Sequence, residues 1–332
     1  MTTRIREDIS LIMTVFNESG GLLPFLATVE RQTVLPARIV IVDGGSRDDT
    51  LDVLEAWTPP EGVEKLVVSA PGANTPTGRN TAVDHVDTPW IVVADGGTEL
   101  NEVWLESLAA KIAPGVDVVS GWFEPLPGTV LSSTIGAVIT PTLDEIDPDT
   151  FMPSCRSVAF RTEAWREVGG QPVWLDRCQD LYMDLVMKRE GYTFVFAPEA
   201  IAAWDARPTL GALYRQYKGY ARGDGKADLW RKRHAVRYGS YTAGILLLLG
   251  IVSTWKPLRP VALLLSVLLG VAGGAYMGKF WRRVWRRRGK VIRNPLLSLL
   301  LAPIVVVTGD LGKMVAYPGG RAWRREHRSE VP

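Results

Sequence analysis

The chain has 332 residues, of which 46% are hydrophobic and 22% are charged, and its formal net charge is +2. This near-neutral total hides a division, because residues 1–210 contain 15 Lys and Arg against 31 Asp and Glu, whereas residues 211–332 contain 23 against 5. The length suffices for a full core and one further module, and two cysteines with three histidines in no metal-binding spacing disfavour a zinc site.

Strands and helices are predicted to alternate through the first 120 residues. Apolar β-branched runs predict the strands, and capped amphipathic stretches predict the helices. The strands are expected at 10–16, 39–42, 66–69 and 91–94, with helices at 22–32, from 46–50 onward, from Arg79 to His85, and at 102–112. This order is typical of an α/β fold: a Rossmann-like, mostly parallel sheet with helices on both faces. Neither G-x-G-x-x-G nor a Walker A motif occurs, which disfavours a dinucleotide dehydrogenase or a P-loop NTPase.

Two predicted strands each end in an aspartate followed by glycines. Asp43 follows the strand at 39–42 and precedes Gly44-Gly45, and Asp95 follows the strand at 91–94 and precedes Gly96-Gly97. Open α/β sheets bind ligands at the carboxyl ends of their strands. A carboxylate there can hold Mg²⁺ or Mn²⁺, and the cation can hold a diphosphate that glycine backbone approaches closely.

Beyond Val118 the pattern becomes irregular. An extended segment is expected at 122–127, a helix or buried flap at 129–139, an acidic solvated loop at 143–150, a strand at 157–160, a helix at 161–168 and a strand at 192–196. Asp180 precedes a predicted helix at 181–190 and is either a helix cap or, beside a sugar-phosphate site, a general base. A further helix is predicted at 209–221, and Arg222-Gly223-Asp224-Gly225 is expected to end it.

The basic C-terminal part contains three uncharged runs. Two of them, Tyr238–Trp255 and Pro260–Gly278, have almost the length that crosses a bilayer. The third, Asn294–Gly309, contains Pro303 and is followed by Asp310, so it either spans or is re-entrant, and we favour the re-entrant alternative. Because basic residues flank apolar runs, a membrane is favoured over nucleic acid as the partner. The distribution of basic residues predicts a multi-pass protein of the cell (inner) membrane with its catalytic domain in the cytoplasm.

Five motifs in the first 200 residues resemble those of the family 2 glycosyltransferases, which have the GT-A fold. These motifs are Thr14-Val15-Phe16-Asn17-Glu18, Ile41–Ser46 with Asp48 and Thr50, Gly78-Arg79-Asn80, Asp95-Gly96-Gly97, and Gln179-Asp180. The resemblance implies that residues 1–236 form a GT-A domain, which the distribution of basic residues predicts to be cytosolic. Charge and hydropathy predict that residues 237–332 form a membrane region with two transmembrane helices and a third spanning or re-entrant segment. The resemblance also implies an inverting transferase that uses a nucleotide-sugar donor.

The resemblance implies a role for each motif. The loop with Val15, Phe16 and Glu18, together with Asp43, would hold the nucleotide base. Arg79, Gly96 and Gly97 would lie near the donor phosphates, Asp95 would bind the divalent metal (Mg²⁺ or Mn²⁺), and Asp180 would be the catalytic base. On the acceptor side the residues would be Gln179 and Arg222.

Several positions depart from the family pattern. Gly97 stands where the family usually has a second Asp, which leaves Asp95 as the sole carboxylate of the motif. Gln179 replaces the usual acidic neighbour of the base. The Q-x-x-R-W motif of processive members is absent, since Gln216 is followed by Tyr217-Lys218-Gly219-Tyr220, and this favours the addition of a single sugar.

The acceptor expected for an enzyme attached to a membrane is lipid-linked or a glycan, and the product a cell-surface polysaccharide or glycolipid. Two alternatives remain open. One is a polyprenyl-phosphate sugar synthase, whose acceptor is itself a phosphate and needs no strong base. The other is a non-catalytic GT-A scaffold, for which the missing second Asp and the altered Gln179 are the support.

Overall fold

The structure, a computed structural model, describes residues 4–252 and 258–331. The chain forms two compact units. The first consists of residues 1–126 and 142–205, and the second of residues 127–141 and 206–332. The predicted division at residue 236 was drawn from charge and hydropathy, and it stays a prediction about where the membrane region begins.

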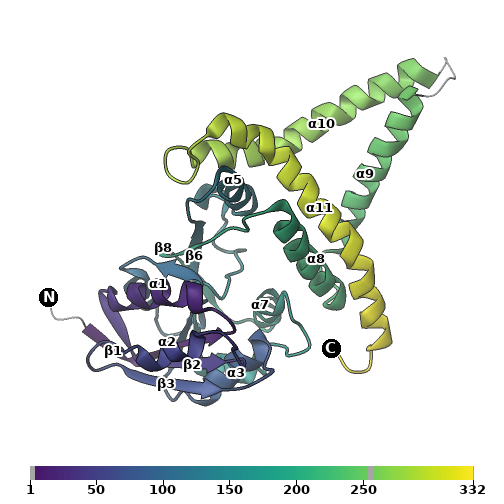
Figure 1. Cartoon of the computed structure of the whole chain (residues 1–332). Helices are drawn as coiled ribbons and strands as arrows, with labels where there is room; N and C mark the ends of the chain where they lie inside the picture. Colours follow the sequence, from purple (N-terminus) through teal and green to yellow (C-terminus); the bar gives the residue numbers. More distant parts are fainter. Residues whose placement is uncertain (1–3, 253–257, 332) are drawn as a thin grey trace. The chain divides into compact units, whose positions relative to one another are not determined.

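An eight-stranded mixed sheet forms the centre of the first unit, with strand order β3-β2-β1-β4-β7-β6-β8-β5. Strands β3, β2, β1 and β4 are mutually parallel, β7 is antiparallel to both of its neighbours, β6 and β8 are parallel, and β5 is antiparallel to β8. The strands are β1 (Arg4–Val15), β2 (Val34–Asp43), β3 (Glu64–Ser69), β4 (Trp90–Val93), β5 (Thr98–Leu100), β6 (Val118–Pro125), β7 (Val158–Arg161) and β8 (Phe194–Trp204). Figure 1 shows β1, β2 and β3 side by side.

Helices cover both faces of this sheet because successive side chains of a strand point to opposite sides. On one face, Leu11 and Met13 of β1 pack with Phe25 of the first helix. On the other face, Ile12 packs with Val83 and Met183. The predicted α/β fold with a mostly parallel sheet is confirmed. The helices of this unit are α1 (Ser19–Glu30), α2 (Thr50–Ala56), α3 (Thr75–Asp84), α4 (Trp104–Ala109), α6 (Thr162–Glu167) and α7 (Gln179–Arg189).

Most predicted elements of this unit are present, with shifted ends. The helix predicted from Arg79 to His85 begins earlier, since α3 starts at Thr75. The helix begins early because Asn74 caps it, accepting a hydrogen bond from the Thr77 backbone N–H at 3.0 Å, and because Pro76 suits a first turn. The acidic segment 143–150 is a loop apart from a short 3₁₀ turn at Leu143–Glu145.

The second unit is helical. Its helices are α5 (Val130–Ile139), α8 (Leu210–Lys226), α9 (Arg231–Val252), α10 (Leu258–Arg286) and α11 (Pro295–Glu326), and α8 and α11 run side by side (Figure 1). Among the described residues, Arg259–Arg286 and Pro295–Glu326 are long and apolar enough to cross a membrane. The first predicted span, Tyr238–Trp255, ends in residues 253–255, which lie outside the described part of the chain.

The predicted end of α8 at Arg222–Gly225 is wrong, because the helix continues to Lys226. The glycines there allow two helices to approach closely and do not break either of them. A Cβ atom on Gly225 would lie 2.6 Å from the Tyr317 carbonyl oxygen and 2.8 Å from the Arg321 nitrogen of α11. Small residues at such a crossing let the backbones of packed helices come together.

Pro303 does not interrupt the third apolar run either. Helix α11 continues through both Pro303 and Pro318. Asp310, which was expected to close the apolar run, lies inside the helix and accepts a hydrogen bond from Arg237 of α9 at 2.7 Å. Whether this segment spans or re-enters stays a prediction.

Candidate active site

A cavity of about 300 Å³ opens at the carboxyl ends of β1 and β2. Three of the predicted donor-binding residues line it, namely Val15, Phe16 and Glu18. The remaining lining residues come from the ends of the neighbouring strand and helix and from the loop before α7: Thr14, Val42, Gly44, Ala73, Asn74, Thr75, Gly78, Asp176 and Arg177. The cavity therefore lies at the sheet edge where open α/β folds bind ligands.

Hydrogen bonds connect the loop after β1 to the loop after β2 beside this cavity. The Asn17 carboxamide oxygen accepts a hydrogen bond from the Arg47 backbone N–H at 2.8 Å, and Asn17 has a φ of 53°. Asp48 accepts hydrogen bonds from the hydroxyls of Thr50 and Ser19, which lower the pKa of Asp48 to about 2. The loop that follows β1 is thus held in shape by the loop that follows β2.

Asp43 lies at the carboxyl end of β2, as the sequence predicts, and its contact with the nucleotide base stays a prediction. Its side chain is fully buried and accepts hydrogen bonds from the backbone N–H groups of Gly45, at 2.9 Å, and of Ser46, at 3.0 Å. It is not among the residues that line the cavity. The carboxylate therefore shapes the turn after β2, which Gly45 makes with a φ of 92°.

Arg79 and Asp95, 16 positions apart in the sequence, form an ion pair. A terminal nitrogen of the Arg79 guanidinium lies 2.6 Å from Asp95 Oδ1, and the Arg79 residue is only 3% exposed. Its other terminal nitrogen donates to Gln171 Oε1 at 3.3 Å. The Asp95 side chain is 40% exposed, so this pair presents a buried cation and an accessible anion at the end of β4.

A second arginine approaches the same carboxylate. Arg156 Nε lies 4.0 Å from Asp95 Oδ2. The Arg156 guanidinium also lies over the Trp204 ring, 4.9 Å from its centroid, and 5.9 Å from the centroid of Phe123. Each oxygen of Asp95 consequently faces a guanidinium group.

Gly96 and Gly97 form the turn after Asp95. A Cβ on Gly96 would lie 3.1 Å from the Met13 methyl group, and a Cβ on Gly21 of α1 would lie 3.4 Å from Gly97 Cα. The nearest side-chain atom to a Cβ on Gly97 would be Glu18 Oε2, at 3.8 Å. This turn therefore packs against the start of α1 and faces Glu18.

Asp180 lies in the first turn of α7 and is partly exposed. Its Oδ1 accepts a hydrogen bond from the Leu181 N–H at 2.9 Å. Burial acts to lower the pKa of Arg79, and the charges of nearby groups, Asp95 and Asp180 among them, raise it overall. Gln179, the residue before Asp180, is 8% exposed. Arg222 lies on α8, in the other compact unit.

Two family profiles match the sequence that builds this geometry. "Glycosyl transferase family 2" matches residues 10–129, and "Glycosyl transferase family group 2" matches residues 90–307, which is most of the chain. The protein is a family 2 glycosyltransferase. No curated protein matches the chain.

The fold of one solved structure, PcManGT, agrees with this assignment. The mannosyltransferase PcManGT from Pyrobaculum calidifontis, in complex with GDP-Man and Mn²⁺, superposes with a TM-score of 0.52 at 16% identity, covering 98% of this chain and 88% of that chain. TarS 1–349 from S. aureus gives a TM-score of 0.48 at 15% identity, covering 96% and 91%. The predicted GT-A fold of this transferase is confirmed.

Four buried or half-buried residues of the glycosyltransferase site carried no motif in the sequence. Gln171 links Arg79 to the Cys155 thiol, with Gln171 Nε2 3.1 Å from Cys155 Sγ. Burial raises the pKa of the Cys155 thiol and also that of the Asp184 carboxyl. Of these residues, Gln171 contacts a sequence motif through its backbone, and this motif was its signal in the sequence. The Asn80 side chain of Gly78-Arg79-Asn80 accepts a hydrogen bond from the Gln171 N–H and donates one to the Gln171 carbonyl. Arg156 is the fourth.

The side chains around Asp95 in this transferase do not form a suitable binding site for a divalent cation. A cation needs oxygen ligands, but one Asp95 oxygen is already paired with Arg79 and the other faces Arg156. Within residues 4–252 and 258–331, no group of three or more His, Cys, Asp or Glu side chains could hold a metal ion. The structure of PcManGT contains Mn²⁺, whereas the metal predicted on Asp95 of this glycosyltransferase stays a prediction.

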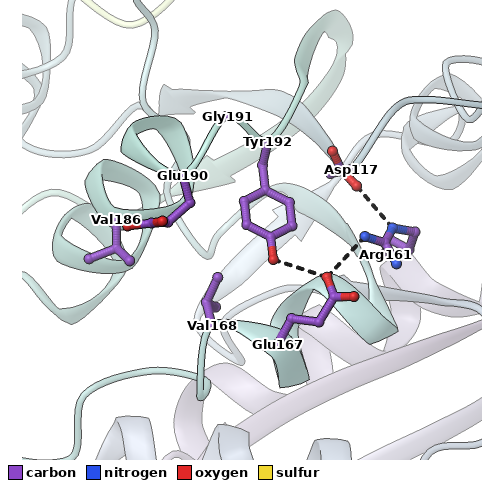
Figure 2. A pocket seen from close by; sticks show the side chains of 8 residues that line it. All are labelled: Asp117, Arg161, Glu167, Val168, Val186, Glu190, Gly191 and Tyr192. Atoms are coloured by element: carbon purple, nitrogen blue, oxygen red, sulfur yellow. Dashed lines mark hydrogen bonds and ion pairs between the residues drawn. The ribbon is translucent and has the colours of Figure 1, made fainter.

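A larger hollow of about 600 Å³ is lined by Asp117, Arg161, Glu167 and Tyr192, among others (Figure 2). Arg161 pairs with Trp90 at the amino end of β4, so this hollow lies at the opposite ends of the strands from the cavity. Its charged groups already pair with one another. Arg161 lies 2.9 Å from Asp117 and 3.2 Å from Glu167, and the Tyr192 hydroxyl donates to Glu167 at 3.0 Å. Arg161, the cation that lines this hollow, is already paired with two carboxylates, which makes the hollow a poor site for a diphosphate.

Proposed function

We propose that this glycosyltransferase moves one sugar, with inversion, from a nucleotide-sugar to a lipid-linked or glycan acceptor at a membrane. The observation that carries the proposal is the ion pair of the buried Arg79 with Asp95, because Gly78, the residue before Arg79, lines the cavity formed by the loop after β1. In the proposal, the nucleoside occupies this cavity, held by Val15, Phe16 and Glu18, and the diphosphate lies over the Gly96-Gly97 turn. Asp43 supports the proposal by shaping the loop that forms one wall.

The chemistry follows from the charges. The bond between the anomeric carbon and the diphosphate breaks, and the diphosphate leaves with the electron pair. Guanidinium groups stabilise such a charge well, because their N–H donors match two phosphate oxygens at once. The acceptor oxygen attacks from the opposite face of the sugar, which inverts the anomeric configuration. Asp180 accepts the proton of the acceptor hydroxyl, with Gln179 and Arg222 on the acceptor side.

A membrane-attached acceptor suits the second unit. Helices α10 and α11 are long and apolar enough to cross a bilayer, which is a weak indication of membrane association. The proposal adds that residues 237–332 form a multi-pass region in the cell (inner) membrane and that residues 1–236 are cytoplasmic, since basic residues gather beside the apolar runs. The acceptor would then be an isoprenoid-linked saccharide, a glycolipid or a growing cell-surface glycan.

Sugar transfer tests the proposal directly. The full chain, purified in detergent, is expected to release nucleoside diphosphate from one member of a panel of UDP-, GDP-, dTDP- and CDP-sugars when membrane lipid extract is added. The product should carry the sugar in the inverted configuration, as determined by NMR of its anomeric proton. If no donor in the panel were consumed with any extract, the non-catalytic scaffold would become the better account. Retained configuration would contradict single displacement.

A further inference from the structure

We propose that Arg79 and Arg156 together neutralise the donor diphosphate, so that donor binding by this enzyme does not depend on a divalent metal. The inference rests on the proposed function, since it concerns the same donor site. The residue that would normally complete a two-carboxylate metal site is Gly97, which has no side chain, and what surrounds the remaining Asp95 is cationic.

The charge balance at this site favours an anion. The ion pairs at Asp95 join two guanidinium groups to one carboxylate and carry one net positive charge before any ligand binds, while Asp180 and Glu18 lie outside these two pairs. A divalent cation on Asp95 would add two more positive charges next to both arginines, with one carboxylate to offset them. A diphosphate, in contrast, would find donors on both sides, and charge-assisted bonds to phosphate are the strong ones.

Contacts with Asp95 and Gln171 fix the position of the Arg79 guanidinium. Its side chain is 4% exposed and lies between Asp95 and Gln171. Gln171 is in turn fixed by Asn80, whose side chain bonds both the N–H and the carbonyl of Gln171. Arg79 Nε is buried and has no hydrogen-bond partner among the described residues, so the residues around the guanidinium leave one of its donors unsatisfied. A preorganised charge of this kind stabilises a leaving group without rearrangement.

Arg156 is held by different contacts. Its guanidinium lies over the rings of Trp204 and Phe123, and one terminal nitrogen donates to Ser154 Oγ at 3.1 Å. Stacking uses the flat face of a guanidinium, while its N–H donors lie in the plane. The Arg156 side chain is 24% exposed, which makes it the accessible member of the pair. Lysine could not reproduce both the stacking and the planar donors.

One carboxylate near the turn offers the competing arrangement. Glu18 Oε2 lies 3.8 Å from the position of a Cβ on Gly97, so Glu18 and Asp95 could together form a two-carboxylate metal site. That arrangement predicts that nucleotide binding requires a metal and is lost in Glu18→Gln. The arginine pair predicts binding without a metal. It also predicts that any loss in Glu18→Gln, whose side chain would contact the nucleoside, is the same in EDTA and in MnCl₂.

The test is a titration of the full chain in detergent with UDP, GDP, dTDP and CDP, by calorimetry, once in EDTA and once with MnCl₂. We expect the preferred nucleotide to bind with affinities that agree within about threefold in the two conditions. In EDTA, Arg156→Ala should weaken binding at least about tenfold, since it removes charge-assisted bonds to phosphate. Arg156→Lys should recover only part of the loss. Arg189→Ala, at the exposed end of α7, is the matched control and should bind as the parent does.

Three results would overturn the inference. Binding that disappears in EDTA and in Glu18→Gln would establish the two-carboxylate metal site and leave the proposed function intact. Unchanged binding by Arg156→Ala in EDTA would remove Arg156 from the donor site. The absence of binding to any of the four nucleotides, with and without MnCl₂, would overturn both this inference and the proposed function.

Discussion

Replacing Asp180 with asparagine is expected to lower the rate of sugar transfer by about 10²–10⁴-fold, the contribution typical of a general base. Asparagine has the shape of aspartate and can still accept the hydrogen bond from the Leu181 N–H that Asp180 Oδ1 accepts at 2.9 Å. The start of α7 should therefore remain intact. What is lost is the ability to take a proton from the acceptor hydroxyl.

Single-turnover transfer and nucleotide titration separate these effects in the Asp180→Asn variant. The Kd for the nucleoside diphosphate should change little, whereas kcat should fall. Glu190→Gln, which removes a carboxylate at the exposed far end of the same helix, is the control and should retain full activity. Normal turnover by Asp180→Asn would contradict the assignment of the base. It would favour a polyprenyl-phosphate sugar synthase, whose phosphate acceptor is already ionised.

Asp184→Asn is expected to stabilise the protein at neutral and alkaline pH. Asp184 lies one turn after Asp180 on α7 and is 1% exposed. Within the part of the chain that the structure describes, neither of its carboxyl oxygens has a hydrogen-bond partner. Burial and the charge of Asp180 raise the pKa of Asp184 well above its usual value, and Lys188 lowers it by a smaller amount. The carboxyl is consequently protonated in the folded state over a range where it is ionised in the unfolded chain.

The sign of the pH effect follows from this difference. Below the unfolded pKa, near 4, both states are protonated and Asp184 has no pH-dependent effect on stability. As the pH rises from there toward the raised folded pKa, the unfolded state alone loses its proton. The free energy of unfolding then falls by up to about 1.4 kcal/mol per pH unit. Asparagine is neutral throughout and removes this loss.

Thermal unfolding of the detergent-purified chain between pH 5 and pH 8 measures the effect of Asp184→Asn. The Tm of the variant should exceed that of the parent, and the difference should grow with pH. Asp176→Asn, an exposed carboxylate before α7, serves as the control and should show no growing difference. A Tm difference that stays constant or shrinks as the pH rises would mean that Asp184 is ionised in the folded protein.

The parts of the site that could be predicted lie at the ends of strands. A run such as Ile91–Ala94 followed by Asp95 specifies both a buried strand and the position of the carboxylate, because parallel strands deliver their carboxyl ends to one edge of the sheet. Two motifs predicted that Arg79 and Asp95 both lie near the donor phosphates, but the ion pair that they form was not predicted, since a metal was expected on Asp95.

The parts that could not be predicted depend on long-range contacts or on backbone detail. Gln171 reaches Arg79 across 92 positions and Arg156 reaches Asp95 across 61, and neither belongs to a repeating pattern. Asp43 was correctly placed after a strand, but its inward turn depends on the left-handed conformation of Gly45. The glycines of α8 were interpreted as a break, because the sequence does not show that α11 packs closely against them.

Photo-crosslinking tests the central claim most directly, that a nucleotide-sugar donor binds at the carboxyl ends of β1, β2 and β4. The full chain would be irradiated with azido-substituted derivatives of UDP and GDP and the labelled peptides identified by mass spectrometry. The account predicts labelling within residues 14–18 or 73–78, suppressed by the matching unmodified nucleotide. Suppressible labelling confined to the hollow with Asp117, Arg161 and Tyr192, at the opposite ends of the strands, would contradict it.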